Sequence, residues 1–334
     1  MLLKSNLSLC AVIGHGSWAT ALVKLLSETQ PKVNWFVRNP EVLESLRLEN
    51  RNCRYLSDVE FDQKSLSLSN NINEIVCEAN IVFLVTPAVY LKSYLSSLEI
   101  SLKDKIVVSA IKGIVPGEYQ TVTEYVRDHY GLPTEQIGFI SGPTHAEEVS
   151  HGRLTHLSVA CTDIENAKRI GKQLKTNFMV INYVHDAVVL EYAAVLKNIY
   201  AIVVGMAKGL GYGDNFISVL VSNCAGEMVR FFKKQCPINI ETLPSGFLGD
   251  LLVSCYSSHS RNRQFGVLIG RGNTVKSALN EMTMVAEGYF AAEYIRFINS
   301  QDLKNTPIAE MAYQVLYKDV PVRKAMKDLE NRLV

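Results

Sequence analysis

A lysine stands in the middle of the most apolar stretch of this chain. Residues 187–207 are apolar almost throughout, and only Glu191, Lys197 and Asn198 interrupt them. Because burial disfavours the charged form of an amine, Lys197 could have a pKa low enough to exchange a proton near neutral pH. A base of this kind suits hydride transfer, since it takes the proton of an alcohol as the hydride leaves. The alternative is a lysine that reaches solvent or pairs with a nearby acid for structural reasons.

Two further groups in the same half of the chain could serve such chemistry. Asp250 heads an apolar run that ends at Ser254, where it could either cap a helix or orient Lys197. Residues 260–263 combine serine, asparagine and two arginines in a predicted loop. Their guanidinium and amide donors suit a phosphate group, although an isolated tetrapeptide of this composition could equally be a solvated turn.

A glycine-containing turn follows the first apolar run of the chain. Residues 7–13 have the apolar, β-compatible composition of a buried parallel strand, and a helical pattern begins at Ser17. Gly14 permits a tight turn between the two, Gly16 leaves room for a pyrophosphate, and Ala19 occupies the third position of the fingerprint. The turn therefore predicts a dinucleotide at the N-terminus of the helix, although any strand-to-helix turn can use a pair of glycines.

The second strand, predicted over residues 32–37, is followed by a residue that bears on the choice of cofactor. An acid at this position hydrogen-bonds the adenosine ribose, whereas an arginine accommodates a 2′-phosphate. Here Arg38 follows the strand, and the first acid is Glu41. Arg38 therefore favours NADPH, or tolerance of both NADPH and NADH. A solvated arginine at the strand end is the alternative.

Three more loops are expected at the carboxyl ends of strands, where ligands lie in sheets of this kind. They contain residues 85–87, residues 112–113 and residues 142–144. Lys112 in the second of these loops could bind an anionic substrate or simply face water.

Strand and helix patterns alternate up to about residue 183, and the strand pattern then disappears. Strands are expected over residues 7–13, 32–37, 66–69, 80–86, 105–111, 137–141, 155–161 and 178–183, with helices over 40–50, 73–79, 88–98 and 164–176. Long helices are expected over residues 187–209, 216–234, 286–300, 308–317 and 322–331. This order predicts an α/β domain with a doubly wound, mainly parallel sheet over residues 1–184 and an all-α domain over residues 185–334.

The composition is that of a globular protein. The chain has 334 residues, of which 48% are hydrophobic and 20% charged, and a net charge of +1 gives no reason to expect a nucleic acid or a membrane surface as partner. Glu191 and Lys197 favour a buried core helix over a membrane span. The seven cysteines form no CxxC pair and no metal-ligating cluster, so we expect reduced core cysteines, a cytoplasmic protein and no metal site. The N-terminal residues lack the pattern of a signal peptide.

Several short segments, in order along the chain, carry a resemblance to one enzyme family. They are GHGSWATA at 14–21, IKGI at 111–114, SGPTHA at 141–146, VLKN at 195–198, GDLLVSC at 249–255, SRNRQFG at 260–266 and VAEG at 285–288. Over nearly its whole length the chain resembles the NAD(P)-dependent glycerol-3-phosphate dehydrogenases. The resemblance implies a Rossmann domain followed by a helical domain like that of 6-phosphogluconate dehydrogenase. It also implies the reversible reduction of dihydroxyacetone phosphate to sn-glycerol 3-phosphate, the backbone precursor of glycerophospholipids.

The same resemblance implies roles for individual residues. Lys197 would be the general acid and base, Asp250 would hold its ammonium group in position, and Lys112 would contact both substrate and cofactor. The implied substrate-binding residues are Lys112, Gly142, Thr144, Lys197, Asn198, Asp250, Ser254, Ser260, Arg261 and Asn262. The implied cofactor-binding residues are Gly14, Gly16, Ser17, Trp18, Arg38, Lys112, Ala146, Arg261, Val285 and Glu287.

Two other functions remain open for a chain of this plan. A β-hydroxyacid or ketopantoate-type reductase would share the two domains, but its unphosphorylated substrate would not need the donors of residues 260–262. A non-catalytic dinucleotide sensor would not need a lysine buried at position 197. The resemblance implies a small phosphorylated three-carbon substrate and a homodimer, and we expect neither membrane insertion nor nucleic acid binding.

Overall fold

The structure is a computed structural model that describes residues 8–235, 243–282, 284–301 and 303–333. Within these ranges the chain divides into two compact units. The first contains the described residues up to 111 together with 122–187, and the second contains 112–121 together with the described residues from 188 onward. From the sequence, residues 112–121 are expected in the first domain. In the structure their two short strands form a hairpin, and its first strand packs against a helix of the second unit.

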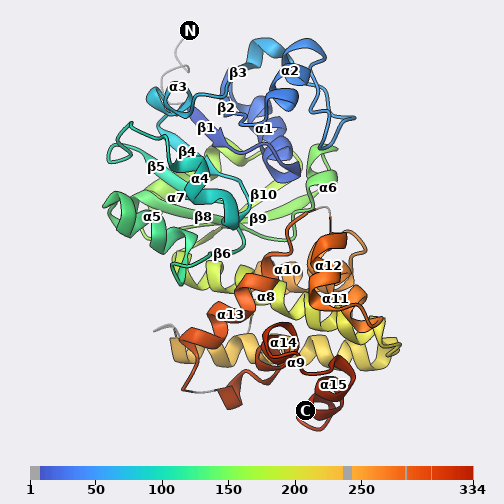
Figure 1. The fold of residues 1–334 in the computed structure, drawn as a ribbon. Helices are drawn as coiled ribbons and strands as arrows, with labels where there is room; N and C mark the ends of the chain where they lie inside the picture. Colours follow the sequence, from blue (N-terminus) through green and yellow to red (C-terminus); the bar gives the residue numbers. More distant parts are fainter. Residues whose placement is uncertain (1–7, 236–242, 283, 302, 334) are drawn as a thin grey trace. The chain divides into compact units, whose positions relative to one another are not determined.

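The first unit is built on an eight-stranded sheet whose order is β10-β9-β8-β5-β4-β1-β2-β3 (Figure 1). Its strands are β1 (Cys10–Ile13), β2 (Val33–Phe36), β3 (Leu66–Ser69), β4 (Ile81–Leu84), β5 (Ile106–Ser109), β8 (Ile137–Ser141), β9 (Thr155–Cys161) and β10 (Met179–Val184). All neighbouring strands are parallel except β8 and β9, which are antiparallel. The predicted mainly parallel sheet is therefore confirmed.

The strand order reverses next to β1, and this reversal creates the place where a ligand is expected. The chain moves outward from β1 through β2 to β3, then returns to β4 on the other side of β1 and continues outward to β5 and β8. Because such crossovers are right-handed, the helices of the two halves cover opposite faces of the sheet. Ligands of doubly wound sheets bind beyond the carboxyl ends of the strands at this switch point, here β1 and β4.

Some helices of the first unit begin at a residue whose side chain caps the helix. They are α1 (Ser17–Thr29), α2 (Pro40–Leu48), α3 (Ile72–Cys77), α4 (Leu91–Leu95), α5 (Val122–Tyr130), α6 (Ala146–Ser150) and α7 (Ile164–Leu174). Asn39 caps α2 by accepting a hydrogen bond from Val42 N, and Asp163 caps α7 in the same way. Helices α5 and α6 are absent from the sequence prediction, and α6 has only five residues.

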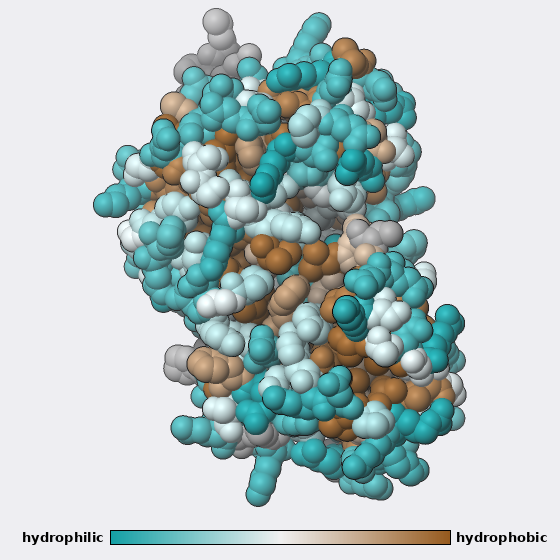
Figure 2. All heavy atoms as spheres, in the orientation of Figure 1, coloured by the Kyte–Doolittle hydropathy of each residue, from teal (hydrophilic) through white to brown (hydrophobic). Residues whose placement is uncertain are grey.

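The second unit is predominantly helical, as predicted. Its helices are α8 (Ala187–Gly209), α9 (Asp214–Gln235), α10 (Ser245–Tyr256), α11 (Arg261–Gly270), α12 (Val275–Glu281), α13 (Glu287–Ile298), α14 (Pro307–Tyr317) and α15 (Val322–Glu330), and its hairpin consists of β6 (Ile114–Val115) and β7 (Gln120–Thr121). Helix α8 is long and apolar enough to cross a membrane, but 94% of its apolar window is buried inside the protein. On the face shown in Figure 2, hydrophilic residues cover most of each unit.

Three details differ from the sequence analysis. Residues 260–263 are not a loop, since Ser260 caps α11 by accepting a hydrogen bond from Arg263 N. Asp250 does not head its helix, because α10 already begins at Ser245. Among the described cysteines, Cys53 and Cys77 are exposed rather than part of the core, and Cys236 lies outside the described residues.

Candidate active site

The turn between β1 and α1 has the geometry that the glycines predict. Gly14 adopts a φ of +134°, and a Cβ added to it would lie 2.1 Å from the carbonyl oxygen of Val85, just after β4. Only glycine fits this close approach of two backbone segments. Trp35 stabilises the turn: its side chain is fully buried, and its Nε1 donates a 2.6 Å hydrogen bond to the carbonyl oxygen of Gly14.

The opposite side of this turn is open. A Cβ added to Gly16 would meet no atom within 4 Å, and Gly16 is the N-cap of α1 without a side-chain capping bond. Ser17 and Trp18 form the first turn of the helix, which contains no acidic residue. Free N–H groups at a helix N-terminus attract anions, and no carboxylate here opposes one. The residues of the turn therefore fit the pyrophosphate of a dinucleotide.

Arg38 follows β2, as predicted, and its side chain is exposed. Its Nη1 donates a 2.8 Å hydrogen bond to Ser93 Oγ, and its guanidinium lies 5.1 Å from the centre of the Tyr94 ring. The nearby acid Glu41 is occupied by an ion pair with Arg54. The end of β2 therefore presents a positive side chain, which fits a 2′-phosphate better than a ribose hydroxyl group.

The segment after β8 holds three more of the implied residues. Gly142 has a φ of +153°, and a Cβ there would lie 2.6 Å from the carbonyl oxygen of His156. Thr144 Oγ1 donates a 3.3 Å hydrogen bond to the carbonyl oxygen of Gly142, and the buried Ala146 begins α6. This segment is tightly constrained at a strand end, where ligands are expected.

The central cluster of the second unit is formed by two lysines that share one carboxylate. Lys197 from α8 lies 2.5 Å from Asp250 Oδ1, and Lys112 lies 2.9 Å from Asp250 Oδ2. Lys197 Nζ also donates a 2.9 Å hydrogen bond to Ser254 Oγ, one helical turn after Asp250 on α10. The side chains of Lys197 and Asp250 are 7% and 6% exposed, whereas that of Lys112 is 20% exposed. Asp250 is therefore paired with Lys197 inside α10, and the helix-cap alternative for Asp250 is wrong.

Burial and neighbouring charges tune this cluster. Burial lowers the pKa of Lys197 to about 8; the carboxylate of Asp250 opposes that fall, and the charge of Lys112 adds to it. Burial alone would raise the pKa of Asp250, but the two ammonium groups outweigh burial and hold it below its usual value. At neutral pH the pair is thus a carboxylate beside an ammonium group that readily loses a proton, a property suited to a general acid and base.

Asn198 connects Lys112 to helix α8. Its Nδ2 donates a 2.6 Å hydrogen bond to the backbone carbonyl of Lys112, and its side chain is buried. Lys112 belongs to the segment 112–121 that the structure assigns to the second unit. Asn198 therefore fixes the backbone from which Lys112 reaches Asp250.

The donors predicted for a phosphate lie at the N-terminus of α11. Asn262 Oδ1 accepts a 2.9 Å hydrogen bond from Gly288 N. This bond uses the amide oxygen and leaves the two N–H groups of the amide for a ligand. Gly288 follows Glu287 at the start of α13, with Val285 just before the helix. Arg261 extends toward Met284, and the Nη1 to Sδ distance is 4.0 Å. The structure therefore brings the starts of α11 and α13 together.

Glycines hold α11 and α13 against α8. A Cβ added to Gly266 would lie 2.0 Å from the carbonyl oxygen of Ile202, and one added to Gly205 would lie 2.1 Å from that of Arg263. A Cβ on Gly288 would lie 2.5 Å from the carbonyl oxygen of Asn198. This close packing, which leaves no room for a Cβ, places the start of α13 beside Asn198 and α11 beside residues 202–205 of α8. This crossing is not among the features expected from the sequence, although the four-residue spacing of glycines in α8 and α11 is a signal for it.

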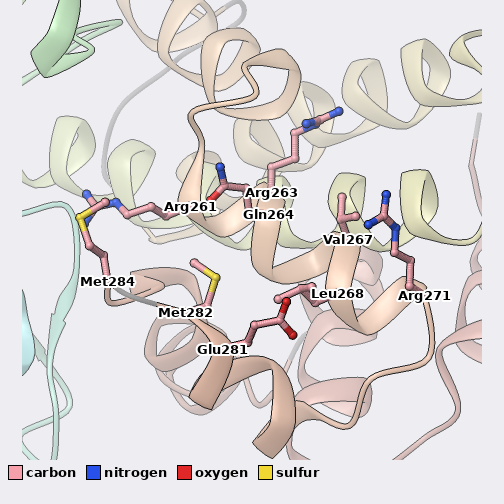
Figure 3. Close-up of a pocket in the computed structure, with 9 residues that line it drawn as sticks. All are labelled: Arg261, Arg263, Gln264, Val267, Leu268, Arg271, Glu281, Met282 and Met284. Atoms are coloured by element: carbon pink, nitrogen blue, oxygen red, sulfur yellow. The ribbon is translucent and has the colours of Figure 1, made fainter.

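A cavity of about 350 Å³ opens along α11 in the second unit (Figure 3). Its lining residues are Arg261, Arg263, Gln264, Val267, Leu268, Arg271, Glu281, Met282 and Met284. Figure 3 shows Arg261 reaching toward Met284, whereas Arg263 and Arg271 lie farther along the helix. Within the described ranges, no group of three or more His, Cys, Asp or Glu side chains could hold a metal ion.

Comparison with known proteins decides the family. The model of the N-terminal part of NAD-dependent glycerol-3-phosphate dehydrogenase matches residues 10–167, and the model of the C-terminal part matches residues 186–327. The chain belongs to this family. It is therefore an oxidoreductase that uses NAD or NADP and acts on a small phosphorylated substrate, as the sequence analysis predicts.

Individual members of the family resemble this chain over its full length. The glycerol-3-phosphate dehydrogenase [NAD(P)+] of Staphylococcus carnosus is 32% identical over 330 residues, which cover 98% of each chain. That of Staphylococcus haemolyticus is 33% identical, with 96% of this chain and 97% of the relative covered. The crystal structure of glycerol-3-phosphate dehydrogenase from Coxiella burnetii has the same fold, with a TM-score of 0.87 and 24% identity over 97% of this chain and 99% of that chain.

Proposed function

We propose that this member of the family reduces dihydroxyacetone phosphate to sn-glycerol 3-phosphate and catalyses the reverse reaction, with Lys197 as general acid and base. The observation that carries the assignment is the buried Lys197–Asp250 pair beside Ser254 and Lys112. NADPH or NADH, when bound, supplies the hydride.

In the reduction, the Lys197 ammonium donates its proton to the carbonyl oxygen of the substrate as hydride reaches the carbonyl carbon. The carbonyl group thereby becomes an alcohol, and Lys197 is left as a neutral amine. In the oxidation the neutral amine takes the hydroxyl proton as hydride leaves the carbon. A pKa of about 8 supports both directions, because both forms of Lys197 are accessible near neutral pH.

Asp250 and Lys112 have opposite effects on the pKa of Lys197. The Asp250 carboxylate fixes the ammonium group and stabilises its charge, whereas Lys112 brings a second positive charge to the same carboxylate. The more exposed Lys112 is suited to contact the anionic substrate. Ser254 accepts a hydrogen bond from Lys197 and limits the directions in which its protons can point.

The substrate phosphate is proposed to bind at the start of α11. Arg261 supplies a guanidinium group, Asn262 its amide donors, and Ser260 the first residue of the motif. The N-terminus of a ten-residue helix adds the positive end of its dipole. Gly142 and Thr144 remain proposed substrate contacts by family resemblance.

The proposed cofactor contacts are the residues that the resemblance implies. They are Gly14, Gly16, Ser17, Trp18, Arg38, Lys112, Ala146, Arg261, Val285 and Glu287. Arg38 follows β2, and the nearby acid Glu41 is already paired with Arg54. These two features support a preference for NADPH. We further propose a cytoplasmic homodimer that provides glycerol 3-phosphate for glycerophospholipid synthesis.

The test follows oxidation of NADPH and of NADH with dihydroxyacetone phosphate, with ketopantoate and without substrate. Turnover only with dihydroxyacetone phosphate supports the proposal. Turnover with ketopantoate would favour the reductase of unphosphorylated acids, and binding without turnover on any substrate would favour a sensor.

A further inference from the structure

The histidine between the two glycines of the β1–α1 turn has an unusual set of neighbours. The His15 ring stacks on Tyr94, with ring centres 6.1 Å apart and an angle of 16° between the planes. Its Nδ1 lies 3.1 Å from the Tyr94 hydroxyl group. Since Arg38 lies 5.1 Å from the centre of the same Tyr94 ring, His15 and Arg38 share one aromatic neighbour.

A second positive group is brought to His15 by a separate loop. The fully buried Asn52 donates a 3.0 Å hydrogen bond to the carbonyl oxygen of His15 and accepts hydrogen bonds from the backbone N–H groups of Arg54 and Tyr55. The Tyr55 ring centre lies 6.4 Å from that of His15. Asn52 therefore ties the loop carrying Arg54 directly to the glycine turn.

The electrostatics of the cluster match this geometry. Burial lowers the pKa of His15, and the positive charges of Arg54 and Arg38 lower it further. The imidazole is thus neutral at neutral pH in the free protein. Arg54 is already paired with Glu41, so a doubly charged anion at this point would mainly offset the charge of Arg38 and favour protonation of the ring. The cluster consequently gains attraction for an anion that a single arginine at the end of β2 would not provide.

The position of the cluster identifies the anion. In doubly wound dinucleotide-binding folds, the adenosine ribose lies at the end of the second strand, next to the glycine turn. Both places meet in this cluster: His15 belongs to the turn and Arg38 follows β2. The nearby carboxylate, Glu41, is bound by Arg54 through Nε and Nη2, so it is not poised to accept a ribose hydroxyl group.

We propose that His15, together with Arg38, binds the 2′-phosphate of NADPH and is a specificity-determining residue of this chain. The inference rests on the dinucleotide-binding part of the proposed function and is independent of the reduction chemistry. Tyr94 orients the imidazole through its hydroxyl group and its ring, and Arg54 contributes charge at longer range.

The test is calorimetric titration of the full chain, without substrate, with adenosine 2′,5′-bisphosphate and with 5′-AMP. The two probes differ only in the 2′-phosphate. The unaltered protein is expected to bind the bisphosphate more tightly. Because a hydrogen bond to a charged group is lost, His15→Ala should weaken bisphosphate binding by about tenfold. Binding of 5′-AMP should change by less than about twofold, since that probe lacks the group that His15 contacts.

Two further variants test the role of the Tyr94 hydroxyl group and the specificity of the His15 effect. Tyr94→Phe keeps the stacked ring but removes the hydroxyl group, so it should give a smaller loss confined to the bisphosphate. His129→Ala, at an exposed position of α5, is the matched control and should change neither affinity. In the unaltered protein, an NMR titration of His15 should show that its pKa rises when the bisphosphate binds and not when 5′-AMP binds.

Three results would overturn the proposal. They are equal affinity of the unaltered protein for both probes, an equal loss of both affinities in His15→Ala, and an unchanged pKa of His15 in the bisphosphate complex. Because none of these measurements involves turnover, a failure of the dehydrogenase assignment would be detected separately, as absence of reduction with either cofactor.

Discussion

The ammonium group of Lys197 lies 2.5 Å from Asp250 Oδ1, and both side chains are almost completely buried. A buried ion pair is costly unless its charges are matched and hydrogen-bonded, and here Ser254 and Lys112 complete the set. The strong desolvation of Lys197 is what makes its proton mobile. The same burial that destabilises the charged form of Lys197 thus lowers its pKa and allows the proposed proton transfer.

Replacement of the lysine tests this chemistry most directly. We expect Lys197→Ala to reduce kcat by about a hundredfold or more, because the proton donor is lost, while binding of NADPH persists. The measurements are steady-state NADPH oxidation and cofactor titration by fluorescence. Lys208→Ala, on the same helix but exposed and paired with Asp214, is the control and should keep its activity. Unchanged turnover in Lys197→Ala would exclude the assigned role.

The pKa of Lys197 predicts opposite pH profiles for the two directions. Reduction needs the protonated form, so its kcat/KM should fall as pH rises through about 8. Oxidation needs the neutral amine, so its kcat/KM should fall as pH decreases through about 8. The pH profiles of kcat/KM are measured for reduction and oxidation with the same cofactor pair. If both values change with pH in the same direction, a single group cannot serve both reactions.

Asp250→Asn should move these profiles. The Asp250 carboxylate raises the pKa of Lys197, so its removal should shift the alkaline limb of the reduction profile to lower pH. We also expect a lower kcat, because the ammonium is less well fixed. Asp214→Asn, which removes an exposed carboxylate of α9, should leave the profile in place. A shift of the reduction limb to higher pH would show that another group titrates.

Arg38→Asp tests the preference for NADPH. The acid would repel a 2′-phosphate but could hydrogen-bond the ribose of NADH, so kcat/KM should fall much more for NADPH than for NADH, by about tenfold or more. Arg169→Asp, at an exposed site on α7, makes the same change in net charge and serves as the control. Equal losses for both cofactors would mean that Arg38 does not contact the phosphate.

The crossing of α8 and α11 makes a prediction about stability. In Gly266→Ala, the new methyl group would lie 2.0 Å from the carbonyl oxygen of Ile202, so the helices must separate. We expect the free energy of unfolding to fall by about 1–3 kcal/mol, together with weaker binding at the start of α11. In Gly213→Ala the added group meets no atom within 4 Å, which makes it the matched control in denaturant titrations. Equal free energies of unfolding for the two variants would show that α8 and α11 can move apart without loss of stability.

Much of the fold could be predicted from the sequence because its signals are local. The strands over residues 66–69, 137–141 and 155–161 and the helix over residues 187–209 have the predicted bounds. Apolar periodicity and turn residues determine such elements, and the glycines at 14 and 16 determine the turn after β1. Helices α5, α6 and α12 lie outside the predicted elements, and α6 and α12 have only five and seven residues, too few for a clear helical period.

Only the tertiary structure decided which chemical groups meet. The sequence alone identified Lys197, Asp250 and Lys112 as candidates, yet each had a structural alternative. Lys197 and Asp250 lie 53 positions apart in the sequence, and the packing of α10 in the second unit brings them together. Lys112 comes from a segment that the sequence assigned to the first domain. Local periodicity specifies which face of a helix is apolar. The partner of a buried charge depends on how the helices cross. Backbone contacts at glycines such as Gly266 determine that crossing.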